Sequence, residues 1–153
     1  MSARRFTIDT NILIYSVAPQ EGDKHLRAKE VLARAADCNC FMTLQALSEF
    51  FVVATGKQRM PKTDAANYVS HCLTLFQSGQ ATATAVLMAI ADATAGRASY
   101  WDALLIATAA EAGCTAILTE DLSDGTMLGP VRILNPFSPH GGLTEPVKQL
   151  LAI

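Results

Sequence analysis

Short apolar segments alternate along this chain with longer segments of helical periodicity, and this alternation constrains the fold more than any other feature. The short segments lie at 6–8, 40–43, 81–84, 115–118 and 131–134. The helical segments lie at 24–36, 44–55, 63–76, 86–95 and 99–112. Strands that alternate with helices pair in parallel, because each connection crosses over the sheet. The chain order therefore predicts an α/β fold with a helix-covered parallel sheet.

The 153 residues, half of them apolar, have the length of one domain with a substantial core. No window approaches ~18 uncharged apolar residues, so we expect no membrane span. The opening MSARR runs into Phe6 without a long apolar stretch, so we expect no signal peptide and a cytoplasmic location. The spacing of Cys38, Cys40, Cys72 and Cys114 fits no zinc pattern. We expect reduced thiols, with Cys72 and Cys114 in the core.

Four of the 14 carboxylates have sequence surroundings in which full solvation is not expected. Asp9 directly follows the 6–8 segment, and Asp121 follows the 115–118 segment. Glu49 and Asp102 have apolar residues one helical turn away, which predicts that both lie on packed helix faces. Ligands of parallel sheets bind outside the carboxyl ends of the strands. We therefore expect Asp9 and Asp121 at the same edge of the sheet.

A cation is the simplest compensation for these carboxylates. An unpaired buried carboxylate costs several kcal/mol, and neither Arg nor Lys lies within one helical turn of Glu49 or Asp102. Ligation by oxygen alone suits Mg²⁺ or Mn²⁺. The predicted catalytic and metal-binding residues are Asp9, Glu49, Asp102 and Asp121. The residues predicted to orient them by hydrogen bonds are Thr10, Asn11, Thr119 and the additional carboxylate Asp124.

Each position also has a purely structural alternative. Asp9 begins a pattern typical of a turn or helix N-cap, and Ser99-x-x-Asp102 fits a capping box. Asp121 is equally compatible with an ordinary loop, and the threonine and asparagine candidates with simple turns. Glu49, on an apolar helix face without a local partner, is the hardest to explain without a cation.

The chain contains a series of runs that resemble, in order, the motifs of PIN-domain nucleases over about residues 4–138. The runs are FTIDTNILIY at 6–15, QALSEFF at 45–51, SYWDALLIA at 99–107, ILTEDL at 117–122 and LNPF at 134–137. The compact length resembles in particular the VapC-type toxins of bacterial toxin–antitoxin modules. Thr119-x-Asp121 fits the family pattern, which favours Asp121 over Asp124 as the residue nearer the metal.

The resemblance implies a three-layer α/β/α fold around a parallel sheet of four or five strands, with the acids at its carboxyl edge. The PIN-like domain would span 1–138, with 139–153 as a tail of the same domain. The resemblance further implies Mg²⁺- or Mn²⁺-dependent endoribonuclease activity, homodimerisation and neutralisation by a small antitoxin.

The net charge of −2 does not indicate nucleic-acid binding, so RNA would be held by local positive charge and by bound metal. Lys57, Arg59 and Lys62 follow the Glu49 helix, and Arg97 precedes the Asp102 helix. These are the predicted RNA-binding residues, with a solvated loop as the alternative for the first three. Trp101 is expected in the core or on a dimer surface rather than as a base-stacking platform.

Other functional classes compete with the toxin hypothesis. A stand-alone RNA-processing nuclease and a non-catalytic PIN-like interaction domain both remain open. A phosphoacceptor domain is disfavoured, because the start of the chain has only Asp9 and no lysine lies between Lys62 and Lys148. The three histidines show no serine or cysteine partner pattern, so a histidine-based nuclease is not supported.

Overall fold

The computed structural model describes residues 4–153; residue 1, the expected start of the domain, lies outside this range. A central sheet has the strand order β3-β2-β1-β4-β6-β5. Its strands are β1 (Phe6–Ile8), β2 (Cys40–Thr43), β3 (Gln77–Gly79), β4 (Ala116–Leu118), β5 (Met127–Leu128) and β6 (Val131–Leu134). All neighbours pair in parallel except β5, which is antiparallel to β6. The parallel part therefore has the predicted character, and β5 is added at one edge.

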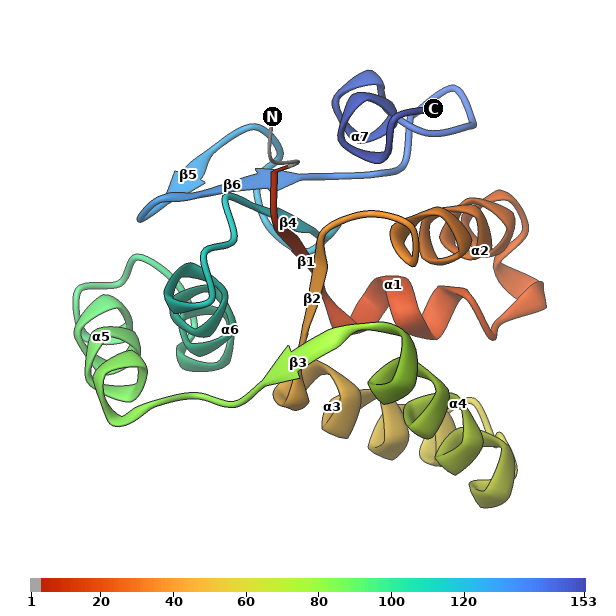
Figure 1. The fold of residues 1–153 in the computed structure, drawn as a ribbon, viewed down its shortest axis with the longest axis horizontal. Helices are drawn as coiled ribbons and strands as arrows, with labels where there is room; N and C mark the ends of the chain where they lie inside the picture. The colour runs from red at the N-terminus through yellow and green to blue at the C-terminus, as the bar shows by residue number, and fades with distance from the viewer. Residues whose placement is uncertain (1–3) are drawn as a thin grey trace.

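Helices cover both faces of this sheet. They are α1 (Thr10–Tyr15), α2 (Asp23–Ala35), α3 (Leu44–Gly56), α4 (Lys62–Leu75), α5 (Ala83–Thr94), α6 (Tyr100–Glu111) and α7 (Glu145–Leu151), with a 3₁₀ turn at Pro19–Glu21. Figure 1 shows α5 and α6 on one side of the sheet and α1, α2 and α7 on the other, while α3 and α4 lie beyond the β3 edge. The predicted three-layer α/β/α architecture is confirmed.

The sheet is buried on both faces at its centre. Every residue of β1 and β4 is buried, including the polar Thr7, as expected for central strands of a parallel sheet. Cys72 and Cys114 are buried as predicted, and all four cysteines are free thiols. No helix within residues 4–153 is long and apolar enough to cross a membrane.

The strand predicted at 81–84 is wrong. Its Thr82 is instead the N-cap of α5, where the Thr82 hydroxyl accepts a hydrogen bond from the Ala85 amide at 3.1 Å. The true strand is β3, an exposed edge strand of sequence Gln-Ser-Gly with no apolar pattern. A side chain at Gly79 would crowd β2, because an added Cβ would lie 2.9 Å from Cζ of Phe41.

The 139–153 segment forms a helix that the sequence did not predict. Val147 and Leu151 of α7 are fully buried, and the Arg34 Nε on α2 donates to the Leu151 carbonyl at 2.8 Å. These contacts support our proposal that the segment belongs to the same domain as 1–138.

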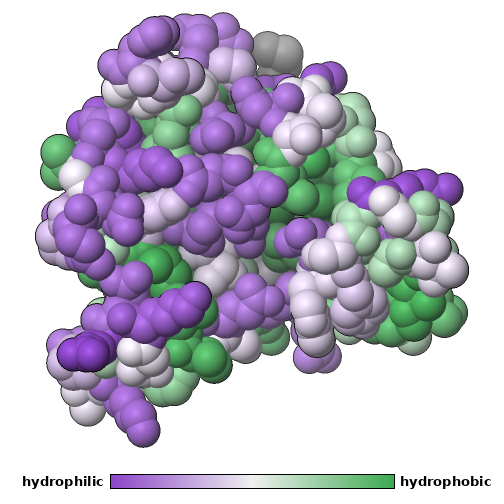
Figure 2. Space-filling model, turned by 180° about the vertical axis from the view of Figure 1, so that it is seen from behind, coloured by the Kyte–Doolittle hydropathy of each residue, from purple (hydrophilic) through white to green (hydrophobic). Residues whose placement is uncertain are grey.

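Exposed apolar side chains gather on α5. Leu87, Met88 and Ile90 are each about half exposed or more. Seen from behind, the surface is apolar on the side of the molecule where α5 lies (Figure 2). The outer face of α5 is therefore available to a protein partner.

Candidate functional site

Asp9 lies at the carboxyl end of β1 and is the N-cap of α1. Its amide donates to the Leu118 carbonyl at 2.9 Å, which fixes it beside the end of β4. One carboxylate oxygen accepts from the Thr10 amide at 2.7 Å and the other from the Thr119 hydroxyl at 2.8 Å. Asp9 is thus an N-cap, as the structural alternative proposed, but its residue is only 7% exposed. Exposed caps have no comparable desolvation cost.

The electrostatics of Asp9 connect it to two other predicted acids. Burial raises the pKa of Asp9 from 3.8 to about 6, against the opposing hydrogen bonds from Thr119 and Thr10. The charges of Asp102 and Asp121 contribute to this increase, as smaller causes than burial. Negative charge from α6 and from the loop after β4 therefore reaches the end of β1, as expected if the three acids share one edge of the sheet.

Glu49 lies on α3, which begins directly after β2 with Thr43 as its N-cap. Its side chain is half-buried, whereas the fully packed face of α3 carries other residues. One oxygen accepts from the Thr10 hydroxyl at 3.1 Å and the other from the Gln45 amide group at 3.1 Å. Gln45, one turn earlier, is thus a local polar partner that sequence reasoning missed. Thr10 links Glu49 to Asp9, since its amide and hydroxyl serve one carboxylate each.

Asp102 lies in the first turn of α6, and Ser99 is the N-cap of this helix, which is the N-cap half of the capping box that was the structural alternative. Ser99 Oγ donates to Asp102 Oδ2 at 2.9 Å, and the Asp102 amide donates to Ser99 Oγ at 3.3 Å. The cap uses one carboxylate oxygen. The side chain is half-buried, and its charge still acts on Asp9.

Thr119 connects Asp9 to the loop that carries Asp121. It is fully buried, donates to Asp9, and accepts from the Asp121 amide at 3.1 Å and from Asn11 Nδ2 at 3.3 Å. Asp121 itself is exposed. The carboxylate of Asp124 accepts instead from the Asn135 amide at 2.8 Å. The geometry therefore favours Asp121 over Asp124 as the acid nearer Asp9.

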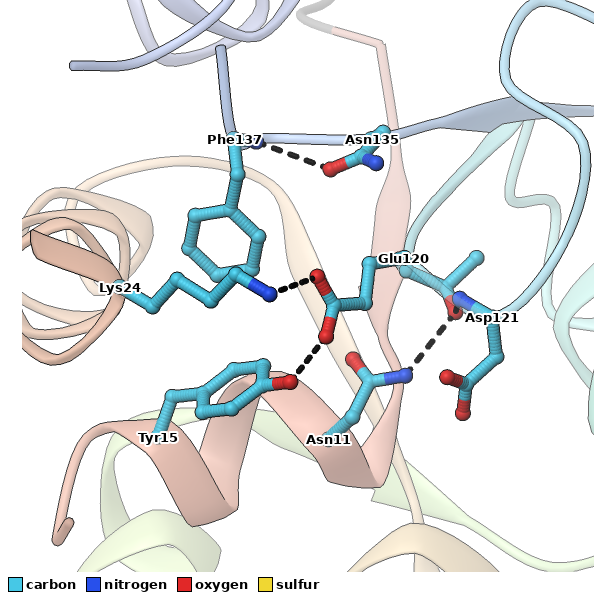
Figure 3. A network of polar contacts seen from close by, with 8 residues as sticks. Asn11, Tyr15, Lys24, Glu120, Asp121, Asn135 and Phe137 are labelled. Atoms are coloured by element: carbon cyan, nitrogen blue, oxygen red, sulfur yellow. Dashed lines mark hydrogen bonds and ion pairs between the residues drawn. The ribbon is translucent and has the colours of Figure 1, made fainter. Parts of the chain in front are cut away.

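Glu120 holds the same loop from its other side. Its carboxylate accepts from the Tyr15 hydroxyl and pairs with Lys24 Nζ at 2.8 Å. Lys24 Nζ also lies 5.3 Å from the Tyr15 ring centroid and 5.7 Å from that of Phe137. Figure 3 shows Glu120 pointing away from Asp121 toward α1 and α2. Sequence reasoning missed this network, and the only available signal was the acidic residue next to Asp121.

The predicted RNA-binding residues do not lie against the acids. Lys57, Arg59 and Lys62 are exposed where α3 passes into α4. Lys57 is eight residues beyond Glu49, a rise of about 12 Å along a helix. Arg97 forms an ion pair with Asp92 at 2.8 Å. Of the ion pairs found in residues 4–153, none involves the four predicted catalytic acids.

The donor chemistry of this edge fits a hard divalent cation. Within residues 4–153, the four acids have no basic partner and Asn11 Oδ1 is buried without a hydrogen-bond partner. Asp9 is also desolvated and repelled by two carboxylates. Across the described part of the chain, however, no three acidic, histidine or cysteine side chains converge closely enough to hold a metal ion as they stand. A bound Mg²⁺ would therefore keep several water ligands, as it commonly does.

A family model described as PIN domain matches residues 6–123. A toxin–antitoxin complex from Klebsiella pneumoniae has a TM-score of 0.57 at 20% identity, over 85% of this chain and 95% of that one. DNA-bound VapBC from Salmonella typhimurium has a TM-score of 0.60 at 14% identity, over 85% and 96%. The sarcin-ricin loop cleaving toxin from Mycobacterium tuberculosis has a TM-score of 0.57 at 18% identity, over 73% and 86%. At these identities the likeness shows the fold. No curated protein matches the chain.

Proposed function

The chain belongs to the PIN-domain family, and on this premise we propose that it is a metal-dependent endoribonuclease acting as the toxin of a toxin–antitoxin module. The observation that carries the proposal is Asp9, a buried carboxylate at the carboxyl edge whose pKa is raised to about 6 beside two further acids. A carboxylate desolvated and repelled in this way lowers the stability of the fold unless a positive charge compensates it. Carboxylates with such perturbed pKa values occur preferentially at functional sites. Binding a cation is the use that this donor set supports best.

Asp9, Glu49, Asp102 and Asp121 would hold Mg²⁺ or Mn²⁺, partly through water. When bound, the metal would activate a water molecule, polarise the scissile phosphate and offset charge on the leaving oxygen. The protein contributes orientation. Thr119 and the Thr10 amide fix the two oxygens of Asp9, and the Thr10 hydroxyl with Gln45 fixes Glu49. Glu120 holds the loop that carries Asp121, through Tyr15 and Lys24.

The RNA strand would approach along the open carboxyl edge of the sheet. Lys57, Arg59, Lys62 and Arg97 are the residues we propose for phosphate contacts at a distance from the acids, since all four are exposed. The solved toxin–antitoxin complexes with this fold support a cognate antitoxin as partner. The exposed apolar face of α5 supports a protein interface, which we propose to be a homodimer contact.

The proposal is tested by RNA cleavage with purified wild type, Asp9→Asn and Asp37→Asn. Asp37 is an exposed carboxylate shortly before β2, at the opposite edge of the sheet, and is the matched control. We expect wild type and Asp37→Asn to cleave RNA with Mg²⁺ and to stop with EDTA, and Asp9→Asn to lose at least about 100-fold in rate, as removal of a transition-state interaction does. Equal cleavage by wild type and Asp9→Asn would refute the site.

Induced expression in a bacterial host tests the toxin part separately. We expect growth arrest by wild type and Asp37→Asn, relieved by Asp9→Asn. Cleavage in vitro without growth arrest would point to a stand-alone processing nuclease. If no divalent metal supports cleavage and expression causes no growth arrest, the remaining hypothesis is the non-catalytic interaction domain.

A further inference from the structure

Trp101 is the only tryptophan in the chain, and this residue, directly before Asp102 on α6, is 62% exposed. The expectation that it lies in the core is wrong. The ring packs edge-on against Tyr100, with centroids 5.0 Å apart and an interplanar angle of 71°. This contact restrains the indole while leaving most of its surface open to solvent. A large apolar surface held exposed beside a candidate active site points to a ligand.

A hollow lies between this indole and α3. It has a volume of about 400 Å³ and is lined by Trp101, Gln45, Ser48 and Glu49. Glu49 therefore belongs both to the acidic edge and to the wall of this hollow. A ligand group in the hollow would be continuous with whatever occupies the acidic edge.

One residue that lines the hollow, Gln45, carries an unused hydrogen-bond acceptor. Gln45 Nε2 donates to Glu49 Oε1 and to the Trp101 carbonyl, each at 3.1 Å. Because both partners only accept, the nitrogen must face them, and the orientation of the amide is settled. Gln45 Oε1 is then buried, with no hydrogen-bond partner among the described residues. A buried acceptor left unpaired is unfavourable, so a small rotation of the Gln45 side chain that turns Oε1 toward a ligand donor in the hollow would be stabilised.

The charge of the hollow selects the kind of ligand group. Its lining holds a carboxylate and no basic side chain, so a phosphate would be repelled. A neutral planar group with N–H donors fits both the indole face and the amide oxygen. Nucleobases have these properties, and stacking on aromatic side chains is a common way to hold unpaired bases of RNA.

We propose that Trp101 and Gln45 form a nucleobase subsite next to the acids, in which a base stacks on the indole and donates an N–H to Gln45 Oε1. The inference rests on the proposed function, since it places a base of the RNA substrate beside the scissile phosphate. Adenine, cytosine and guanine would be favoured through their exocyclic amino groups.

Intrinsic fluorescence tests the subsite without cleavage, because Trp101 is the only indole. The Asp9→Asn variant in EDTA is titrated with hexa-adenylate RNA and, separately, with ribose 5-phosphate, which lacks a base. We expect saturable quenching by hexa-adenylate and none by ribose 5-phosphate. Absence of quenching by the RNA, or equal quenching by both probes, would overturn the subsite.

Cleavage kinetics provide a second test in the wild-type background. Trp101→Leu should raise KM for RNA roughly 5- to 150-fold with little change in kcat, and Trp101→Tyr should restore most of the loss, as expected for stacking. Leu26→Ala, which shortens an exposed side chain on α2, is the matched control and should leave KM unchanged. An unchanged KM in Trp101→Leu would overturn the subsite while the nuclease proposal stands.

The outcomes separate the two proposals and a rival role for Trp101. Quenching by hexa-adenylate in a protein that cleaves no RNA would support base binding and refute the nuclease. A concentration-dependent blue shift of the wild-type fluorescence without RNA, together with loss of dimerisation in Trp101→Leu by analytical ultracentrifugation, would assign the indole to a dimer surface and overturn the subsite.

Discussion

Replacing Asp9 by asparagine removes a buried negative charge, and the effect on folding stability depends on pH. Asp9 is 7% exposed, and burial is the largest cause of its raised pKa. In the unfolded chain the carboxyl titrates near 3.8, and in the folded protein near 6. Well below pH 3.8 the group is protonated in both states and carries no penalty. As pH rises from about 4 to about 6, the unfolded chain ionises while the folded protein still holds the proton, so stability is lost, and the loss is complete once the pH has passed the folded pKa of about 6.

The magnitude follows from the difference between the two pKa values. A pKa raised from 3.8 to about 6 corresponds to about 3 kcal/mol of stability lost between pH 4 and pH 7. The asparagine variant has no such titration. Its asparagine amide replaces the carboxylate in the hydrogen bonds with Thr10 and Thr119, which shifts the stability of the variant by about 1 kcal/mol at every pH. This constant shift does not change how stability depends on pH.

Urea denaturation of both proteins in EDTA, from pH 4 to pH 8, measures this difference. We expect the free energy of unfolding of Asp9→Asn to gain about 3 kcal/mol on wild type across this range. Titration of the groups that do not interact with Asp9 is common to both proteins and cancels. A difference that stays constant with pH would refute the claim that Asp9 is desolvated. Adding Mg²⁺ at pH 7.5 should stabilise wild type more than the variant.

Three further substitutions test the fold and the loop after β4. Leu151→Ala removes a fully buried side chain of α7 and should lower the free energy of unfolding by about 2–5 kcal/mol in urea denaturation. Gly79→Ala places a Cβ 2.9 Å from Phe41 and should cost about 1–3 kcal/mol in the same assay. Glu120→Gln breaks the ion pair with the partly exposed Lys24, so stability should fall by less than about 1 kcal/mol. Its RNA-cleavage rate should fall clearly more than that of the Asp37→Asn control.

The central strands and the order of the acids were predictable because short local patterns in the sequence indicate them. Phe-Thr-Ile and Ala-Ile-Leu are compact apolar runs, and parallel pairing then brings the residues after them to one edge. Helix starts were predictable where a polar cap precedes an apolar run, as at Ser99.

The elements that were missed have weak local patterns. β3 is an exposed edge strand, so its sequence carries no apolar signal, and β5 has only two residues. α7 is short and begins with a proline in its first turn, which resembles a loop until its contact with α2 is seen.

The site details that were missed depend on tertiary contacts. Gln45 joins α3 to the Trp101 carbonyl, and Glu120 joins the β4 loop to Tyr15 and Lys24. Each of these contacts spans more than 50 residues of sequence. Local spacing contains no information on such pairs. The same holds for the exposure of Trp101, since an aromatic residue in an apolar helix is usually buried.

The central claim is that the four acids at the carboxyl edge act together as one divalent-cation site. Titration with Mn²⁺, with free ion followed by electron paramagnetic resonance, measures this directly in wild type, Asp9→Asn, Asp102→Asn and Asp37→Asn. We predict saturable binding of one or two ions by wild type and Asp37→Asn, with affinity reduced at least about 10-fold in the other two variants. Equal Mn²⁺ binding by all four proteins, or no saturable binding by wild type, would contradict the account.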